Sequence, residues 1–276
     1  MWMIEQIEVD PEQRGRYVMD LCEGGLQTRR ISVDESTLGQ FLMRKGMEMD
    51  SVLLEEILYF DTCTTAYKCA LPFLSQKMRT TKEVVCFLEE EGFTQPVIQK
   101  ACQKLQNYGL LNDVEYARAF VRTKKNVERI GRRAIEQQGL QKGIQAADLE
   151  EGLLQYTKTE ERQAIEYWLR KIQKRIEKYS TREKEQRIRS FLQQKGFGMQ
   201  LISVVLAEQK EKVDMTVEDI DWEPLVKQGE KLLRKYANVP DDFTRNRKIK
   251  QTLYRKGFQA DAIARFLKQY ASNIDT

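Results

Sequence analysis

The stretch RIRSFLQQKGF (187–197) recurs with variations at three other places: EVVCFLEEEGF (83–93), RAIEQQGLQKGI (133–144) and KIKQTLYRKGF (248–258). Each copy ends on a glycine and one further apolar residue, and three of the four place apolar residues both eight and four positions before that glycine. Those two positions share one face of a helix, and glycine readily ends a helix in the left-handed conformation. The stretches therefore predict four helices, each closed by one of the repeat glycines Gly92, Gly143, Gly196 and Gly257.

Further amphipathic segments flank each repeat glycine. Apolar residues return six and ten positions after it, as Ile98 and Cys102 do in the first copy. Apolar segments also precede the four copies, at Ala66–Leu74, Tyr116–Val121, Ile165–Ile176 and Leu225–Tyr236. Recurrence at roughly 50-residue intervals is typical of tandem helical repeats. The sequence thus predicts four three-helix modules, at residues 60–108, 109–157, 158–212 and 213–276.

The second copy departs from the pattern at one position. Gly139 stands four residues before Gly143, where the other copies have leucine. A glycine inside a helix costs about 1 kcal/mol relative to alanine. We expect Leu140 to rotate inward and fill the space.

The first 59 residues differ from the modules, because they predict strands. Residues 3–9, 16–22 and 26–33 are rich in β-branched and aromatic side chains, and Gly24-Gly25 is a turn signal between the last two. Asp34 and Asp50 are suited to cap the short helices that follow. The predicted fold is therefore mainly α: an elongated, curved array of tandem three-helix, helix-turn-helix-like repeats behind a small N-terminal β-sheet region at residues 1–59.

The composition excludes several kinds of site. The chain of 276 residues has no histidine, so it has no Ser-His-Asp triad and no His-ligated zinc. Its five cysteines form no CxxC pair, which favours reduced thiols in a cytoplasmic protein. We find no phosphate-binding glycine motif and no apolar run of membrane-spanning length. The sequence therefore predicts a cytoplasmic protein that is not an enzyme and that needs no cofactor or metal.

The charge is unevenly distributed. Residues 1–60 hold 6 Lys and Arg against 12 Asp and Glu, although the whole chain carries a net charge of +4. A single basic cluster is commonly a solvated helix face, but basic clusters recur between the first and second helices of modules two to four. Recurrence favours a binding surface that follows a long acidic partner. We call the following residues the basic strip: Arg118, Arg122, Lys124, Lys125, Arg129, Arg132, Arg133, Lys171, Lys174, Arg175, Arg182, Arg187, Arg245 and Lys248.

Three-helix units also raise the possibility of helix-turn-helix binding to duplex DNA. That mode needs a recognition helix with base-reading side chains near its start. The third helices begin TQPVIQ, QAADLE, GMQLIS and QADAIA, which are poor in such residues. Sequence-specific reading is disfavoured, whereas a helix-turn-helix array that binds duplex DNA by itself stays an alternative, as does a helical scaffold for another protein.

Several stretches resemble the RecX regulatory-protein family. GLLNDVEYARAFVRTK (109–124) with GRRAIEQQGLQKGI (131–144) is similar to its central signature, and AYKCALPFLSQKMRTTKEV (66–84) to its first module. WEPLVKQGEKLLRKY (222–236) with QTLYRKGFQADAIARFL (251–267) looks like the extra C-terminal module of longer Gram-positive members. The sequence departs from the family pattern at Asn112, Gly139 and residues 76–78.

The resemblance implies a regulator of RecA, the strand-exchange recombinase of DNA repair, homologous recombination and the SOS response. Family members are not enzymes; they lie in the groove of the RecA–single-stranded DNA filament and in most cases inhibit it. The implied partners are the RecA filament and single-stranded DNA, with at most weak binding to duplex DNA, and the implied form is a monomer. The basic strip would then face DNA phosphate or an acidic RecA surface.

Overall fold

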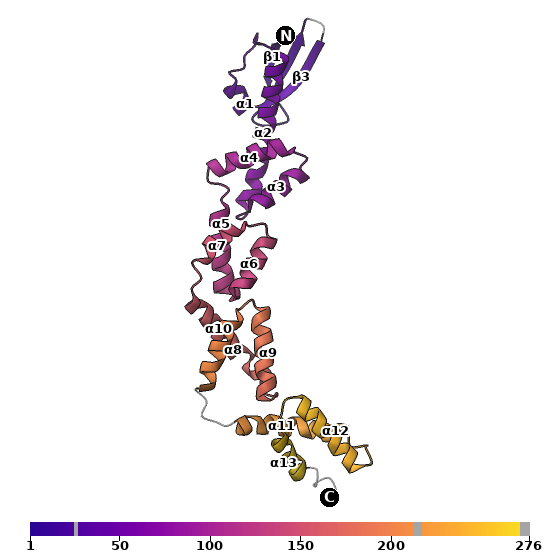
Figure 1. Ribbon diagram of the computed structural model, residues 1–276. Coiled ribbons are helices and arrows are strands. Elements are labelled where there is room, and N and C mark those ends of the chain that lie inside the picture. Colours follow the sequence, from indigo (N-terminus) through magenta and orange to yellow (C-terminus); the bar gives the residue numbers. More distant parts are fainter. Residues whose placement is uncertain (25–26, 212–216, 271–276) are drawn as a thin grey trace. The chain divides into compact units, whose positions relative to one another are not determined.

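The computed structural model describes residues 1–24, 27–211 and 217–270 (Figure 1). The chain forms two compact units, the first from residues 1–119 and 139–151 and the second from residues 120–138 and 152–276. A small sheet lies at the N-terminal end of the first unit, and the rest of the described chain is mainly helical. The predicted fold class, mainly α with a small N-terminal sheet, is confirmed.

The N-terminal region of residues 1–59, which we call the head, contains a four-stranded antiparallel sheet in the order β3-β2-β1-β4. The strands are β1 (Trp2–Val9), β2 (Arg16–Glu23), β3 (Gln27–Asp34) and β4 (Glu48–Met49). Ile4, Met19, Leu21 and Val33 are fully buried, because alternate residues of a strand face the same side of the sheet. The three predicted strands are confirmed, and the short β4 is an addition.

Helix α1 follows β3 and helix α2 follows β4, and both begin at a predicted cap. The Asp34 carboxylate accepts from the Ser36 amide at the start of α1 (Glu35–Gln40), and the Asp50 carboxylate accepts from the Leu53 amide at the start of α2 (Ser51–Ser75). The sequence predicts two separate segments here, a short helix after Asp50 and the apolar segment Ala66–Leu74. The structure joins them into one helix that continues across residues 59 and 60, since no glycine or proline interrupts the chain there.

Asp61 of α2 fastens the head to this helix. Its Oδ2 accepts from Arg16 Nη2 at 2.8 Å, while its Oδ1 accepts from the Asp34 amide at 2.6 Å and from Thr37 Oγ1 at 2.9 Å. The carboxylate is buried. A buried charge is tolerated only when it is paired and hydrogen-bonded, and these three donors meet that need.

The substitution Asp61→Asn is expected to lower the free energy of opening of the head by about 2 kcal/mol. The amide keeps the two acceptor contacts of Oδ1 but leaves Arg16 without its counter-charge. Amide hydrogen exchange of β2 and β3 measures this opening free energy. Asp20→Asn, which breaks the exposed pair with Arg30, serves as the control with a loss below about 0.5 kcal/mol. Equal protection in both variants would contradict the anchoring role.

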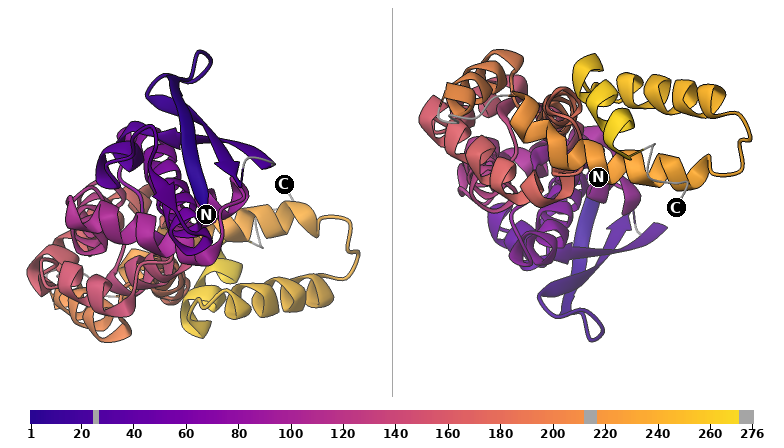
Figure 2. Two further views of the ribbon diagram at one scale, coloured as in Figure 1. Left: turned by 90° about the horizontal axis from the view of Figure 1, so that it is seen from above. Right: turned by 90° about the horizontal axis from the view of Figure 1, so that it is seen from below.

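The helices follow one another in groups of three, in the order that the repeat predicts. The first combines α2 with α3 (Thr81–Glu90) and α4 (Gln95–Asn107). The others are α5 (Asp113–Thr123), α6 (Arg132–Gln141) and α7 (Ala146–Leu153); α8 (Lys158–Ile176), α9 (Thr181–Gln194) and α10 (Met199–Glu211); and α11 (Val217–Lys235), α12 (Asp242–Arg255) and α13 (Ala260–Tyr270). In the last of these, α11 and α12 run side by side in both views of Figure 2. All four repeat glycines have positive φ, between 84° and 87°, which confirms their predicted role as helix ends.

The expectation for Leu140 is wrong. Its side chain is exposed, and the space beside Gly139 is filled by Leu149 of α7. A Cβ added at Gly139 would lie 2.4 Å from Leu149 Cδ2. The glycine therefore permits a close approach between α6 and α7. This explains why the position four residues before Gly143 holds no leucine.

Three of the repeat glycines also lie against the preceding module, and Gly196 shows the contact most clearly. The amides of Gly131 and Arg133, at the start of α6, donate to the carbonyls of Lys195 (2.8 Å) and Gly196 (3.2 Å). A Cβ added at Gly196 would lie 2.3 Å from Ala134 Cβ. The helix start and the glycine turn thus touch along their backbones, and we call this contact a junction.

The same kind of junction is present in both compact units. Thr80 Oγ1, before α3, donates to the carbonyl of Lys142 at 3.4 Å, and Ser180 Oγ, before α9, donates to the carbonyl of Lys256 at 2.6 Å. Each acceptor directly precedes a repeat glycine. Gly92 has no module before it, and an added Cβ there would meet nothing within 4 Å.

A carboxylate completes each junction. In each pair, the amide of the first residue of a module's second helix donates to an acidic side chain of the first helix of the next module. The pairs are Thr81 N to Asp113 (2.8 Å), Arg132 N to Glu161 (3.2 Å) and Thr181 N to Asp221 (2.7 Å). A carboxylate stabilises a helix N-terminus by capping free amides and by its charge. Successive modules are therefore fastened by one repeated set of contacts.

Candidate functional site

The structure divides the basic strip into residues with and without a counter-charge. Arg118, Lys124, Lys125, Arg132, Arg187 and Arg245 form ion pairs with carboxylates of their own chain. The remaining members, apart from Arg129, are exposed and have no ion pair within the described ranges: Arg122, Arg133, Lys171, Lys174, Arg175, Arg182 and Lys248. The second group is the part of the strip whose charge is available to a partner.

Some of the paired residues hold the fold together. The Lys125 side chain is only 12% exposed; its Nζ lies 2.8 Å from Glu160 and 2.7 Å from the carbonyl of Gln155. The hydrogen bond from Lys125 lowers the pKa of Glu160. Arg118 binds both Glu115 and Glu151. These cations already have partners, and the contacts fasten elements within each unit.

A cluster of cations and aromatic rings brings two predicted members together from different modules. The Arg129 guanidinium lies 3.8 Å from the centre of the Tyr167 ring, and Lys171 Nζ lies 4.8 Å from the same ring. Lys171 and Lys195 also approach the Trp168 ring, at 5.5 and 4.4 Å. Cations are attracted to aromatic faces, which allows three positive groups to gather in a small region.

Local backbone structure positions Arg129 in this cluster. It follows the π-helical turn η1 (Lys124–Glu128) and has a positive φ of 52°, which is uncommon for a residue with a side chain. Its carbonyl accepts from Trp168 Nε1 at 2.7 Å. That bond ties the loop before α6 to α8, so the two predicted basic regions meet.

The positive charge of this cluster lowers the pKa of the Tyr167 phenol. A hydrogen bond from Lys171 lowers the pKa of Tyr167, and the charges of Lys171 and Arg129 lower it further, against a smaller opposing effect of burial. The cluster therefore favours a negatively charged group nearby.

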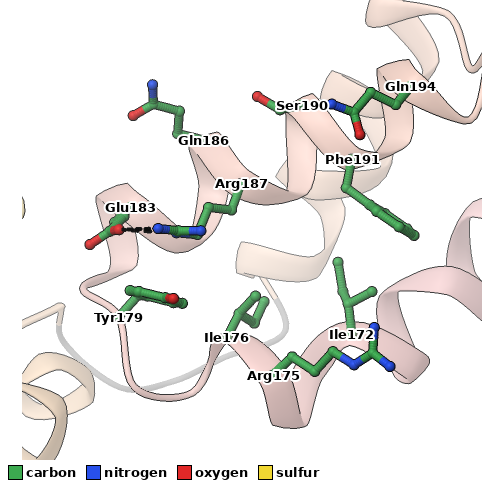
Figure 3. Close-up of a pocket in the computed structure, with 10 residues that line it drawn as sticks. All are labelled: Ile172, Arg175, Ile176, Tyr179, Glu183, Gln186, Arg187, Ser190, Phe191 and Gln194. Carbon is green, nitrogen blue, oxygen red and sulfur yellow. Dashed lines mark hydrogen bonds and ion pairs between the residues drawn. The ribbon is translucent and has the colours of Figure 1, made fainter.

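A groove lies between α8 and α9, with a volume of about 620 Å³ (Figure 3). Ile172, Ile176 and Phe191 supply its apolar part. Arg187 pairs with Glu183 at 2.8 Å, and its guanidinium covers the Tyr179 ring at 4.0 Å. The other polar lining residues are Arg175, Gln186, Ser190 and Gln194. The groove thus combines apolar surface with guanidinium, hydroxyl and amide groups.

Four cations near the C-terminal end of α8 share one side of the helix, and one of them, Arg175, also lines this groove. Lys171, Lys174, Arg175 and Lys178 are exposed and follow the spacing of a single helical face, and we call them the α8 face. Lys174 and Arg175 stand in the last turn of α8 and Lys178 just beyond it, where the helix dipole stabilises positive charge. The α8 face offers charge and hydrogen-bond donors, which suit the binding of an anionic polymer.

Sequence reasoning missed two components of this site. Lys195 was not assigned to the strip, although it precedes Gly196 in the repeat, and Tyr167 was not singled out. The spacing of Tyr167, Trp168 and Lys171 places the three side chains near one side of a helix. This spacing is the sequence pattern that could have identified the cluster.

The chain matches three domain profiles of RecX. The first three-helix domain matches residues 66–105, the second matches 112–153, and the third matches twice, at 160–206 and 218–267. The regulatory protein RecX of Halalkalibacterium halodurans is 32% identical over 267 residues, which cover 97% of this chain and 99% of that protein. This chain belongs to the RecX family. RecX of Geobacillus thermodenitrificans is also 32% identical, over 98% of each chain.

Solved RecX structures agree with the fold. A crystal structure of regulatory protein RecX has a TM-score of 0.65 at 29% identity and covers 75% of this chain and all of its own. RecX from Lactobacillus salivarius has a TM-score of 0.52 at 30% identity, over 54% of this chain and 96% of that one. The family is one of regulatory proteins rather than enzymes. In the part of the chain that the structure describes, none of the helices is long and apolar enough to cross a bilayer.

Proposed function

We propose that this RecX-family protein regulates RecA by binding the RecA–single-stranded DNA filament through its second unit. The observation that carries the proposal is the gathering of unpaired cations on the α8 face, next to the cluster of Arg129, Lys171 and Lys195 on aromatic rings. A filament of DNA and protein presents phosphate and acidic side chains in a regular array. Exposed cations attract such a surface from a distance and hold it on contact.

Modules in series make the binding cumulative. Once one module of the four proposed (60–108, 109–157, 158–212 and 213–276) is bound, the next contact is intramolecular and benefits from a high effective concentration. The junctions support this, because they fix each helix start against the next module. A monomer that bridges several RecA subunits in the filament groove would resist their rearrangement, so we expect it to slow filament growth and ATP turnover.

The alternative is an array that binds duplex DNA without RecA. Electrophoretic mobility with RecA-coated single strands, bare single strands and bare duplex, across a salt series, separates the two. We expect the coated strand to be shifted at a roughly tenfold lower protein concentration than the duplex, because it offers contacts to several modules at once. Tighter, salt-resistant binding to bare duplex would contradict the proposal and favour the alternative.

A further inference from the structure

A second pocket, outside the basic strip, lies in the first unit. It has a volume of about 530 Å³ and is formed by residues of α2 and α4 together with Phe41, which directly follows α1. Phe41, Tyr59, Phe60 and Tyr108 supply aromatic walls, and Cys63 lies among them. It is more apolar than the groove between α8 and α9, so it suits a different kind of ligand.

One side chain of this pocket and one directly beside it are largely open to solvent. The Tyr108 side chain is 66% exposed. Leu42, directly after Phe41, is 81% exposed and has a positive φ of 48°, a conformation that costs a side-chain-bearing residue about 1 kcal/mol. Exposed apolar groups with a strained backbone beside them are typical of surfaces that bind a partner.

One side of the pocket is positively charged. Lys100 and Lys104 of α4 line it, and neither has an ion pair within the described residues. Burial raises the pKa of the Cys63 thiol, whereas the charges of Lys100 and Lys104 act on the same thiol in the opposite direction. Their field therefore reaches the interior of the pocket. Glu56 of α2 is the one acidic residue that lines it.

The arrangement favours a peptide over a nucleotide. Phe41 and Phe60 meet edge to face, with ring centres 5.5 Å apart and planes at 85°, so this pair offers no flat platform for a base. Glu56 would repel a polyphosphate backbone but can accept from peptide N–H groups. Two lysines beside an apolar cavity complement a carboxylate next to an apolar side chain.

We infer that this pocket docks a short acidic segment of a partner protein, which inserts one aromatic or aliphatic side chain between α2 and α4 and places its carboxylates on Lys100 and Lys104. The inference goes beyond the proposed function and does not depend on the α8 face. It gives the first unit a binding role of its own.

The test is a titration of the full chain, labelled with ¹⁵N, with the peptide acetyl-Glu-Glu-Phe-Glu-amide. We expect shifts of backbone amides at residues 56–64 and 100–108, with a Kd on the order of 1 mM for so short a peptide. The double substitution Lys100→Glu with Lys104→Glu should weaken binding at least roughly tenfold. Lys45→Glu with Lys77→Glu makes the same charge change at exposed sites outside the pocket and should leave binding unchanged.

Two comparison ligands make the outcome decisive. Acetyl-Lys-Lys-Phe-Lys-amide and hexathymidylate should produce no shifts at these amides. Shifts caused by hexathymidylate alone would show a nucleotide site and overturn the inference. An acidic peptide that causes no shifts at several millimolar, or that binds both double variants equally well, would overturn it too.

Discussion

Replacing Lys171, Lys174 and Arg175 together by glutamate is expected to weaken binding to the RecA–single-stranded DNA filament by roughly a thousandfold, or about tenfold for each reversed charge. Each substitution removes an exposed cation that has no ion pair within the described part of the chain and places a repelling charge at the same point. The readout is the protein concentration that halves RecA ATP hydrolysis on single-stranded DNA.

A matched control keeps the net charge equal. Arg44→Glu, Lys45→Glu and Lys77→Glu change the charge by the same amount at exposed positions of the first unit. The concentration of this control that halves RecA ATP hydrolysis should lie within a few-fold of that of the unmodified chain. Circular dichroism should show equal helix content in both variants. Equal inhibition of RecA by the triple glutamate variant of α8 and by the control would show that the filament does not contact the α8 face.

Gly196→Ala is expected to destabilise the junction between the second and third modules by about 3–4 kcal/mol, whereas Gly92→Ala costs about 1 kcal/mol. Both glycines have nearly the same φ, 85° and 87°, so the backbone strain is equal. They differ in their surroundings, because the new methyl group at Gly196 would meet Ala134, including its backbone nitrogen at 2.4 Å, while at Gly92 it meets open space.

Hydrogen exchange resolves this difference locally. The amides at the start of α6, including those of Gly131 and Arg133 that donate to the turn, should lose protection in Gly196→Ala. In Gly92→Ala only α3 and the turn after it should become less protected. Equal losses of amide protection at the start of α6 in the two variants would mean that the repeat glycines serve only to end helices.

The sequence was sufficient to predict the repeat, because its signal is local. Apolar spacing defines each helix pair within about 25 residues, and the glycine fixes where the first helix of the pair ends. The junctions could not be predicted in the same way. The contact between Ser180 and Lys256 joins residues far apart in the chain, and no local pattern distinguishes Gly92, which is free of such a contact, from Gly257.

The basic strip shows the same limit. Its residues are visible in the sequence, but whether a cation is available depends on distant acidic residues. Arg118 is held by Glu151 and Lys125 by Glu160, while Lys171, at a similar local charge density, stays unpaired within the described residues. The misplacement of Leu140 has the same origin, since Leu149 of the next helix decides what fills that space.

The salt dependence of filament binding tests the central claim most directly. The affinity of the unmodified chain and of the triple glutamate variant for RecA-coated single strands is measured from low to high salt. We predict that the slope of log affinity against log salt is shallower in the variant by roughly 2, as three lost phosphate contacts on a single strand require. Identical slopes would contradict the claim that the α8 face binds the filament by charge.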